Sequence, residues 1–466
     1  MNPCTPIGQR VFLGIAFLVC LLGFNISAAD QAVWKVGLAS RNITPTVGLK
    51  MYGYGSRTKP SEGVKCAIWV KAMALEDAEG NQGVIVTTDL GAVWPSFTDP
   101  VVERVQKVTG LRKDQIVFTS SHNHSGPLPR MDESVSDGWT EEEVRNSVAY
   151  THKVIDDFTA AVVEAWKARK PAKLSWGMGF APFVMNRREF TERGVILGDQ
   201  FSGPADRSVP VLRVTDMKGK VRGMLFGTAC HNTTLGGKNM AITGDFAGYA
   251  QKYIEDTMPG VQAMFITGCA GDANPYPRDR TEGTDGWDHV EAHGETLGKE
   301  VCRLAAKELV PVRGPLKTAA GVAEIPFQSK LSREALQTVA NGRQRSPASN
   351  AKALLRILDR GEPLPLSQNA PVSVWQFGGD LTWVALSGEV VVDYLYLIQN
   401  ALGPLKLWVS AYSHDVFGYV TSAKVQREGG YESKGITGRG IFDLEAQDAY
   451  VEKVEELAKK VGREVE

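Results

Sequence analysis

The sequence lacks an excess of positive charge, which limits the partners that the protein can bind. Its 466 residues contain 52 Lys and Arg against 53 Asp and Glu, and no stretch of the chain gathers the basic residues. Proteins that bind nucleic acid or anionic membrane surfaces usually carry a basic patch, because they must neutralise phosphate groups. We therefore expect no nucleic-acid partner and no electrostatic attraction to a membrane surface.

Cysteine is also scarce, and its spacing excludes the common paired motifs. The chain has six cysteines, and no two of them form a C-x-x-C pair. Cys66, Cys230, Cys269 and Cys302 lie outside the N-terminal apolar segment. Four cysteines allow three disulfide connectivities, and the sequence does not choose among them. Free thiols are equally compatible with the sequence, because a chain of this length does not need disulfides for stability.

The chain has one long apolar run, and it lies at the N-terminus. Arg10 precedes residues 11–26, which are almost all apolar, and Ser27-Ala-Ala29 offers small residues for cleavage. This order is typical of a secretory signal peptide, and the run is short for a membrane span of roughly 20 residues. A retained N-terminal anchor is the alternative. We predict that residues 1–29 are removed and that the protein is secreted or periplasmic.

The remaining chain contains strand and helix patterns in a mixed order. Short β-prone runs bounded by turn residues predict strands at 34–44, 66–76, 83–88, 116–121, 173–179, 209–214, 221–229, 261–267, 372–377, 381–386 and 405–410. Helical periodicity predicts helices at 100–108, 140–168, 248–258, 291–306 and 442–461. This order predicts an α/β fold, in which one large domain of mixed sheets with helices packed on them spans residues 30–466.

Three stretches depart from this regular order. Residues 329–362 indicate a helical insertion with a loose middle. Between the strands at 173–179 and 209–214, Asn186, Arg187 and Arg188 predict a polar loop, and residues 412–431 also have the pattern of a loop. None of these stretches is a low-complexity linker that would separate domains, so the prediction of a single domain stands.

Two histidines follow the buried strand pattern at 116–121. His122 and His124 stand just before the turn Ser125-Gly-Pro127. In an extended backbone, side chains two residues apart project to the same side. Two imidazoles on one side suit a transition metal, zinc above all, although the same pair could be two hydrogen-bonded histidines beside a turn.

Other polar residues recur at the same kind of place, at or soon after the end of a predicted strand. They are His231, Asp272, Glu389 and, more loosely, Tyr419. Loops at strand ends often carry the chemistry of α/β enzymes, because a rigid sheet positions them. Two histidines, one carboxylate and one further oxygen would form a catalytic zinc site, whose bound water attacks an amide or ester carbonyl near neutral pH.

Three aspartates near these positions have simpler interpretations as well. Asp89 and Asp245 either orient the histidines through hydrogen bonds or serve as strand-end and capping residues. Asp272 is better explained as a brace for its loop than as a reacting group.

In their order and spacing, the motifs around these residues resemble the catalytic domain of the neutral/alkaline (non-lysosomal) ceramidases. Ser121–Pro127 resembles the Thr-His-Thr-His-Ser-Gly-Pro segment of that family. Further similar segments are His231-Asn-Thr-Thr, Ile242–Tyr249, Gly388-Glu389, Tyr419-Val-Thr421 and Tyr431-Glu432. The resemblance extends from Val36 to about Tyr431. It implies a zinc-dependent amidohydrolase of ceramidase-like fold.

The resemblance also implies a role for each site residue. One zinc ion per chain would be held by His122, His231, Glu389 and Tyr419. His124 would act as acid and base or bind the attacking water. Arg187 and Tyr431 would donate hydrogen bonds to the substrate carbonyl as negative charge develops on its oxygen.

The sequence departs from the family in two respects. The family loop reads Gly-Asp-Val-Ser-Pro-Asn, whereas this chain has Gly271-Asp-Ala-Asn-Pro-Tyr276, so that Asn274 occupies the serine position. An amide is not a nucleophile, but it can donate a hydrogen bond, so a zinc-bound water remains compatible with the site. The immunoglobulin-like domain that follows in the family is not expected within residues 30–466.

We therefore predict a zinc-dependent hydrolase of linear N-acyl amides, for which ceramide, and hence sphingolipid metabolism, is what the family implies. One alternative is a metal-dependent deacylase of another amide or ester, such as an acylated sugar. A second alternative is a secreted metal-binding or carbohydrate-binding protein without catalysis. The expected partner is a small-molecule or lipid amide, and a lipid would bring peripheral membrane contact. The sequence leaves the oligomeric state open.

Overall fold

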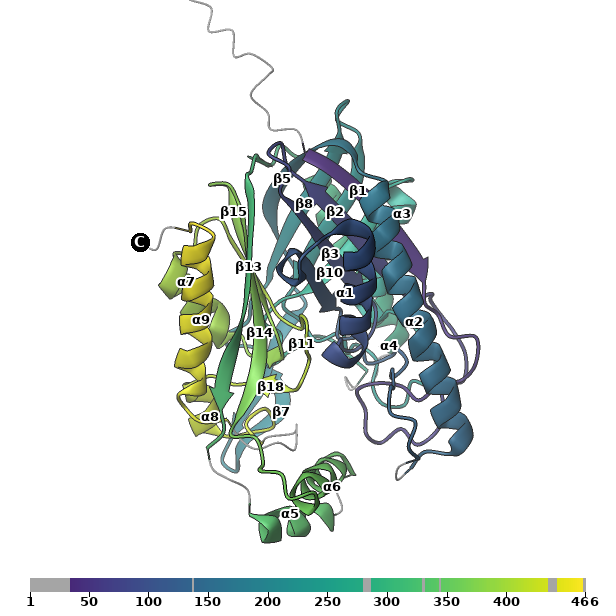
Figure 1. Cartoon of the computed structure of the whole chain (residues 1–466), viewed down its shortest axis with the longest axis vertical. Coiled ribbons are helices and arrows are strands. Elements are labelled where there is room, and N and C mark those ends of the chain that lie inside the picture. The colour runs from purple at the N-terminus through teal and green to yellow at the C-terminus, as the bar shows by residue number, and fades with distance from the viewer. Residues whose placement is uncertain are drawn as a thin grey trace, which may run out of the picture. The chain divides into compact units, whose positions relative to one another are not determined.

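Two β-sheets that pack face to face form the centre of the fold (Figure 1). The computed structural model describes residues 34–135, 138–279, 286–328, 332–342, 345–434 and 442–463, so the predicted signal peptide lies outside the described residues. Ala32–Glu466 forms one unit. The larger sheet has, in spatial order, β10 (Gln262–Thr267), β9 (Val221–Thr228), β8 (Ser208–Asp216), β5 (Lys170–Phe180), β1 (Trp34–Asn42), β2 (Trp69–Glu76), β3 (Gln82–Thr88) and β4 (Ile116–Ser120), with β12 (Val310–Val312) beside β5.

The larger sheet is mixed, as the sequence predicted. Strands β3 and β4 run parallel, as do β9 and β10, whereas the pairs between them are antiparallel. The second sheet is also mixed and consists of β13 (Leu316–Pro326), β14 (Ser367–Phe377), β15 (Leu381–Leu386) and β17 (Leu407–Ser410). Large aromatic side chains fill the space between the two sheets, among them Trp34, Trp375, Phe377, Trp383 and Trp408. These residues bury enough apolar surface to hold the sheets together.

Helices cover the outer faces of both sheets (Figure 1). On the larger sheet lie α1 (Pro95–Thr109), α2 (Glu141–Lys167), α3 (Asp245–Thr257) and α4 (Gly286–Ala305). On the second sheet lie α7 (Asp393–Leu402) and α9 (Ala446–Lys460). Thr140 and Glu143 start α2 with a capping box, in which each side chain accepts the backbone N–H of the other residue. The prediction of mixed sheets with helices packed on them is confirmed.

The predicted polar loop between residues 179 and 209 is wrong. Strands β6 (Val184–Thr191) and β7 (Gly194–Gln200) form a hairpin there, and β11 (Ala273–Pro275) pairs with β6 to make a small third sheet. Arginines are rarely buried, and for that reason the sequence indicated a loop. Arg187 and Arg188 are nevertheless 4% and 3% exposed, because an acidic residue distant in sequence neutralises them.

Several other elements also differ from the sequence prediction, for example α4, which starts at Gly286 rather than at 291, and β14, which starts at Ser367 rather than at 372. Helix α1 starts at Pro95 rather than at Pro100, which lies inside the helix. Proline favours the first turn of a helix, and Pro95 already fills that position. The stretch 412–431 contains β18 (Tyr419–Val420) and α8 (Ala423–Glu428) as well as loop. Strand β18 pairs with β16 (Glu389–Val390), so that two short segments form one parallel ladder.

The remaining features lie away from the central layers. A short 3-10 helix, η2 (Lys113–Gln115), precedes β4. Within residues 329–362, α5 (Arg333–Ala340) and α6 (Arg345–Asp359) pack on each other around a small apolar cluster of their own. Every cysteine of the described chain is a free thiol. None of the helices formed by the described residues is both long and apolar enough to cross a membrane.

Candidate metal centre and catalytic pocket

Two loops that follow strands of the larger sheet bring the histidines together. His122 comes two residues after β4, and His231 comes three residues after β9. A backbone bridge between Asn123 and Asn232 joins the two loops, and the rings of His122 and His231 lie 4.7 Å apart. His122 has φ +54°, a left-handed conformation that costs energy for any residue but glycine. Such strain is typical of functional sites.

The β16–β18 ladder brings a carboxylate and a phenol to the same place. Glu389 pairs directly with Tyr419 in this parallel ladder. The Oε2 atom of Glu389 lies 3.2 Å from Nε2 of His122 and 3.3 Å from Nε2 of His231. The hydroxyl of Tyr419 lies 3.4 Å from Nε2 of His231. The structure therefore brings together the residues that the sequence assigned to one zinc ion.

The hydrogen bonds on the far side of each imidazole fix the position of its proton. Nδ1 of His122 lies 2.9 Å from the carbonyl oxygen of Gly91, and Nδ1 of His231 lies 2.6 Å from that of Ala270. Because a carbonyl oxygen only accepts, each Nδ1 carries the proton and each Nε2 presents a lone pair. These lone pairs face Glu389 Oε2, a buried atom without a hydrogen-bond donor among the described residues. Imidazole nitrogens and a carboxylate oxygen that converge without a shared proton fit a bound zinc ion.

Backbone carbonyls therefore orient the two histidines, and the predicted aspartates do not. Asp89 accepts hydrogen bonds from the backbone N–H of Trp69 and from the amide of Gln251. Asp245 accepts from backbone N–H groups of the loop that follows His231, and it lies at the start of α3. The Asp245 carboxylate thus braces the loop that follows His231, whereas the Asp89 carboxylate joins the start of β2 to α3, and neither forms a hydrogen bond with the rings.

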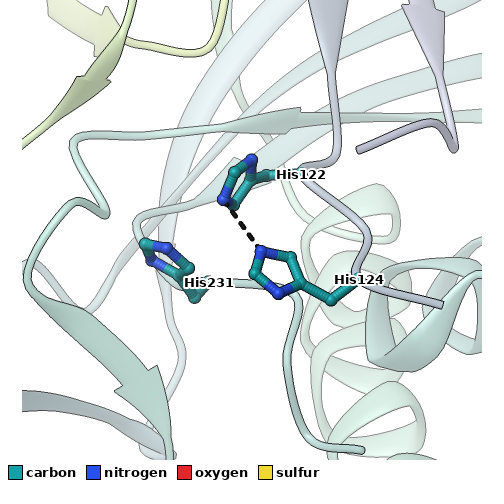
Figure 2. Close-up of side chains that lie close together, drawn as sticks. All are labelled: His122, His124 and His231. Carbon is teal, nitrogen blue, oxygen red and sulfur yellow. Dashed lines mark hydrogen bonds between the residues drawn. The ribbon is translucent and has the colours of Figure 1, made fainter. Parts of the chain in front are cut away.

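His124 lies beside the pair formed by His122 and His231 (Figure 2). Its Nε2 is 3.1 Å from Nε2 of His122, and one ligand nitrogen from each of the three histidines lies within 4.8 Å of the others. Burial, together with the two neighbouring histidines, holds the pKa of His124 well below its ordinary value. His124 is therefore neutral at pH 7 and can accept a proton.

Two aromatic residues lie close to His124. The rings of Tyr52 and Tyr54 lie 5.6 Å and 5.0 Å from the ring of His124. The run Tyr52–Gly55 therefore forms part of the site. Arg57 donates hydrogen bonds to the backbone carbonyls of both Tyr52 and His124, which holds the two segments together. No motif in the sequence singled out Arg57.

Arg187 connects the histidine cluster to the rest of the site. It lies on β6 at a point where the register with β7 shifts, and such irregularities redirect side chains. One terminal nitrogen lies 2.9 Å from the Tyr419 hydroxyl and the other lies 3.4 Å from Oδ1 of Asn274. Nε donates to Glu432 at 2.9 Å. Each terminal nitrogen retains a second N–H group for a substrate.

Glu432 is a residue of the site whose role the sequence did not reveal. Its buried carboxylate also accepts from Arg188 at 2.7 Å, so one negative charge holds two buried guanidinium groups. A sequence gives no local signal for this arrangement, because 245 positions separate Glu432 from Arg187. Tyr431, the preceding residue, lies with its ring 5.7 Å from the Arg187 guanidinium and 5.6 Å from the Tyr419 ring.

A cavity of about 400 Å³ lies next to these groups. Its described lining includes the site residues His124, Arg187, His231, Asn274, Tyr419 and Tyr431. Asp272 does not reach the cavity, because one carboxylate oxygen accepts from the Asn186 side chain and the other from the backbone N–H of Val392. Burial raises the pKa of Asp272 to about 6. Asp272 thus braces its loop, as the sequence suggested, whereas the residues predicted to hold zinc, transfer the proton or bind the substrate carbonyl lie close together.

Comparison with known proteins places the chain in a family. Residues 34–322 match the sequence model described as neutral/alkaline non-lysosomal ceramidase, N-terminal. The chain belongs to the neutral/alkaline non-lysosomal ceramidase family. The family match ends before Glu389, Tyr419 and Tyr431. These three residues are therefore assigned to the site from their position in the structure alone.

The members of this family that match this chain are distant from it in sequence. Neutral ceramidase A of Dictyostelium discoideum is 23% identical over 284 residues, which cover 55% of this chain and 38% of that protein. The neutral ceramidase of Drosophila melanogaster is 24% identical over 277 residues, which cover 56% of this chain and 39% of that protein. The alignments thus span about two fifths of the length of these relatives.

Solved structures share the fold over most of this chain. The neutral ceramidase from Pseudomonas aeruginosa superposes with a TM-score of 0.70 at 19% identity, and the match covers 92% of this chain and 74% of that one. A ceramidase complexed with C2 gives a TM-score of 0.72 at 18% identity, with 93% and 76% of the two chains covered. At such identities the likeness establishes the ceramidase-like fold of this chain.

Proposed function

We propose that this protein is a zinc-dependent hydrolase that cleaves linear N-acyl amides. The observation that carries the proposal is the convergence of Nε2 of His122, Nε2 of His231 and Oε2 of Glu389. These electron-rich atoms would repel one another without a cation, whereas zinc takes such ligands. The Tyr419 hydroxyl would supply a further ligand, and the membership of the ceramidase family supports the same reaction class.

The residues around the centre have complementary roles in amide hydrolysis. Bound zinc would polarise the scissile carbonyl and lower the pKa of a water molecule to near 7. His124, which is neutral at pH 7, takes the proton of the attacking water and passes it to the departing amine. Arg187 and Tyr431 line the cavity and donate hydrogen bonds to the carbonyl oxygen. Such donors each contribute roughly 3 to 4 kcal/mol as negative charge develops.

Two substrate classes are compatible with this site. Relatives named neutral ceramidases, and a ceramidase of the same fold complexed with C2, favour a lipid amide, which would bring peripheral contact with a membrane. The cavity favours a second candidate, a deacylase of polar amides or esters such as acylated sugars. Leu197 is the sole aliphatic side chain among the described residues that line the cavity.

Metal analysis and turnover would test the proposal together. We expect one zinc ion per purified chain, and turnover of an N-acyl p-nitroanilide that a chelator abolishes and added zinc restores. His231→Ala removes one ligand and should eliminate turnover. His414→Asn is the matched control, because the His414 side chain bonds to Ser373 and has no hydrogen bond or ring contact with a site residue in the described part of the chain. Parallel assays with C2-ceramide and an acetylated sugar would separate the two substrate classes.

Zinc binding without turnover of any of these substrates would favour a non-catalytic metal-binding protein. Turnover that survives both chelation and His231→Ala would contradict the proposed centre. We also propose that the protein is exported, on the basis of residues 1–29. Mass spectrometry of the N-terminus of the protein expressed in a bacterial host would test this proposal.

A further inference from the structure

A buried arginine that the proposed hydrolysis does not use contributes to the wall of the cavity. Arg278 comes three residues after β11, is 8% exposed and belongs to the described lining of the cavity. The next residue, Asp279, anchors this segment. Its backbone N–H donates to the carbonyl of Thr234 at 2.9 Å, and its carboxylate accepts from the backbone N–H of Gly236 at 3.1 Å. The backbone that carries the Arg278 guanidinium is therefore fixed beside the cavity.

Tyr54 connects Arg278 to the histidine cluster. A terminal nitrogen of Arg278 lies 3.4 Å from the Tyr54 hydroxyl, and the ring of Tyr54 lies 5.0 Å from the ring of His124. The Tyr54 hydroxyl donates to the backbone carbonyl of Leu235 at 2.8 Å, which fixes the position of the phenol. Arg278 thus lies on the same side of the cavity as His124, one phenol ring away from it.

A second guanidinium group adds positive charge to this part of the wall. Arg57 lies over the Tyr54 ring at 4.8 Å and donates to backbone carbonyls, and none of the described carboxylates forms an ion pair with it. Burial lowers the pKa of Arg57 to about 10, and the nearby Asp245 offsets this effect only in part. The carboxylates of Asp245 and Asp279 accept from backbone N–H groups. The cations Arg57 and Arg278 therefore attract an anionic group to this part of the cavity.

We propose that Arg278 binds a carboxylate group in the amine half of the substrate, so that the substrate class is the N-acyl amino acids. A planar guanidinium binds a carboxylate through two parallel hydrogen bonds, and Asp199, the single carboxylate among the described lining residues, is exposed to water. His124, beside Arg278, would pass the proton to the departing amine, whereas Arg187 and Tyr431 serve the carbonyl oxygen. Hydrolysis would break the C–N bond and release a carboxylic acid and a free amino acid. This inference rests on the proposed hydrolase function.

Pairs of amides that differ by one charge test this selection directly. N-butyrylglycine and N-butyryl-β-alanine carry the carboxylate at two distances from the amide, and their primary amides are neutral and of nearly the same shape. We expect the zinc-loaded protein to release butyrate from at least one of the acids with a kcat/KM at least tenfold above that of its primary amide. A site that offers a buried charged donor rejects the analogue that lacks the charged acceptor.

Variants of Arg278 should weaken this preference in steps. Arg278→Gln removes the charge, so the ratio of the two kcat/KM values should fall at least tenfold. Arg278→Lys keeps the charge but loses the planar fork, so the ratio should fall severalfold and stay above one. Arg193→Gln is the matched control, because Arg193 lies in the exposed turn between β6 and β7, outside the described lining of the cavity, and its loss should leave the ratio unchanged. A melting curve for each variant would show whether the protein is folded.

Calorimetric binding of the same compounds separates this inference from the proposed function. Binding of one acid at least tenfold tighter than its primary amide, lost in Arg278→Gln, would support the inference even if no amide is hydrolysed. Equal kcat/KM for each acid and its primary amide would overturn the inference and leave the hydrolase function intact. A preference that survives in Arg278→Gln would overturn it as well, because the carboxylate would then bind zinc or another cation. No binding of either acid at millimolar concentration, together with no turnover, would also overturn it.

Discussion

At the scale of single residues, the buried carboxylate of Glu432 has the strongest predicted effect. It neutralises Arg187 and Arg188, whose side chains are 5% and 3% exposed. Removing one partner of a buried ion pair leaves an uncompensated charge and costs about 3 to 5 kcal/mol. We therefore expect Glu432→Ala to lower the free energy of unfolding by this amount in urea titrations, and to reduce turnover because Arg187 loses its anchor.

The control for this prediction is the second acidic partner of Arg188. Glu428 lies 3.1 Å from Arg188, but its side chain is 22% exposed, so water screens the interaction. Glu428→Ala should therefore cost about 1 kcal/mol or less. Equal effects of the two alanine variants would show that burial of the Glu432 ion pairs is not what stabilises β6.

Two tyrosines near Arg187 should separate metal binding from substrate binding. The hydroxyl of Tyr419 lies 3.4 Å from Nε2 of His231, whereas Tyr431 contacts the Tyr419 ring and Arg187. Tyr419→Phe keeps the ring and removes the oxygen, so the affinity for zinc should fall roughly 10- to 100-fold in competition with a chelator. Tyr431→Phe should leave zinc affinity unchanged and lower kcat. A Tyr419→Phe protein with unaltered zinc affinity would exclude Tyr419 as a ligand.

The sequence predicted the residues of the site better than the contacts between them. His122 and His231 follow recognisable strands, so their positions at the ends of β4 and β9 could be predicted from apolar patterns. The atoms that hold the imidazoles in place could not, because they are backbone carbonyls of Gly91 and Ala270 and have no side-chain signature. Glu432 was missed for a related reason, since its partners lie on another part of the chain.

At the scale of elements, the α5–α6 pair should be removable without damage to the site. Strands β13 and β14 are still paired where the insertion begins, with Pro326 opposite Ser367, and the backbone N–H of Phe327 donates to Leu366 at 3.0 Å. The helices pack on each other around their own small cluster. Replacing residues 328–365 by an Asn-Gly turn should therefore close a regular hairpin.

This excision has a defined expected result. The shortened protein should bind zinc like the natural chain, hydrolyse a small p-nitroanilide within a factor of two, and melt within a few degrees of it. A deletion of residues 194–200, which removes β7, is the contrasting variant, because this strand contributes Leu197, Gly198 and Asp199 to the cavity. Loss of activity toward small amides after the first excision would contradict our interpretation of 329–362 as an insertion.

Strands β14 and β15 could be predicted from their apolar residues, whereas β6, whose burial follows from ion pairs, was missed. The strands predicted at 372–377 and 381–386, which form the hairpin of β14 and β15, could be recognised because they are apolar and are bounded by turn residues. Strand β6 was mistaken for part of a loop because Asn186, Arg187 and Arg188 are polar. The burial of this strand depends on Glu432, so its strand character is a property of the tertiary structure.

At the scale of the whole molecule, buried histidines should make stability depend on pH. Burial lowers the pKa of His231 to about 3 and that of His293 and His414 to about 4. The unfolded chain takes up these protons near the ordinary value of about 6.5. Between the two values the unfolded state binds more protons than the folded state, so stability rises with pH there. The stabilisation is complete above about pH 6.5 and is lost as the pH falls toward 4.

His414 allows this prediction to be tested away from the metal centre. It has φ +61°, which asparagine tolerates, so His414→Asn removes the titrating group without backbone strain. In zinc-free protein, the natural chain should lose about 3 kcal/mol more stability than the variant between pH 7 and pH 4, measured by urea unfolding. The comparison cancels the contribution of Asp272, whose raised pKa of about 6 acts in the opposite direction. If the free energy of unfolding of the two proteins changes in parallel with pH, His414 is not the group that takes up a proton on unfolding.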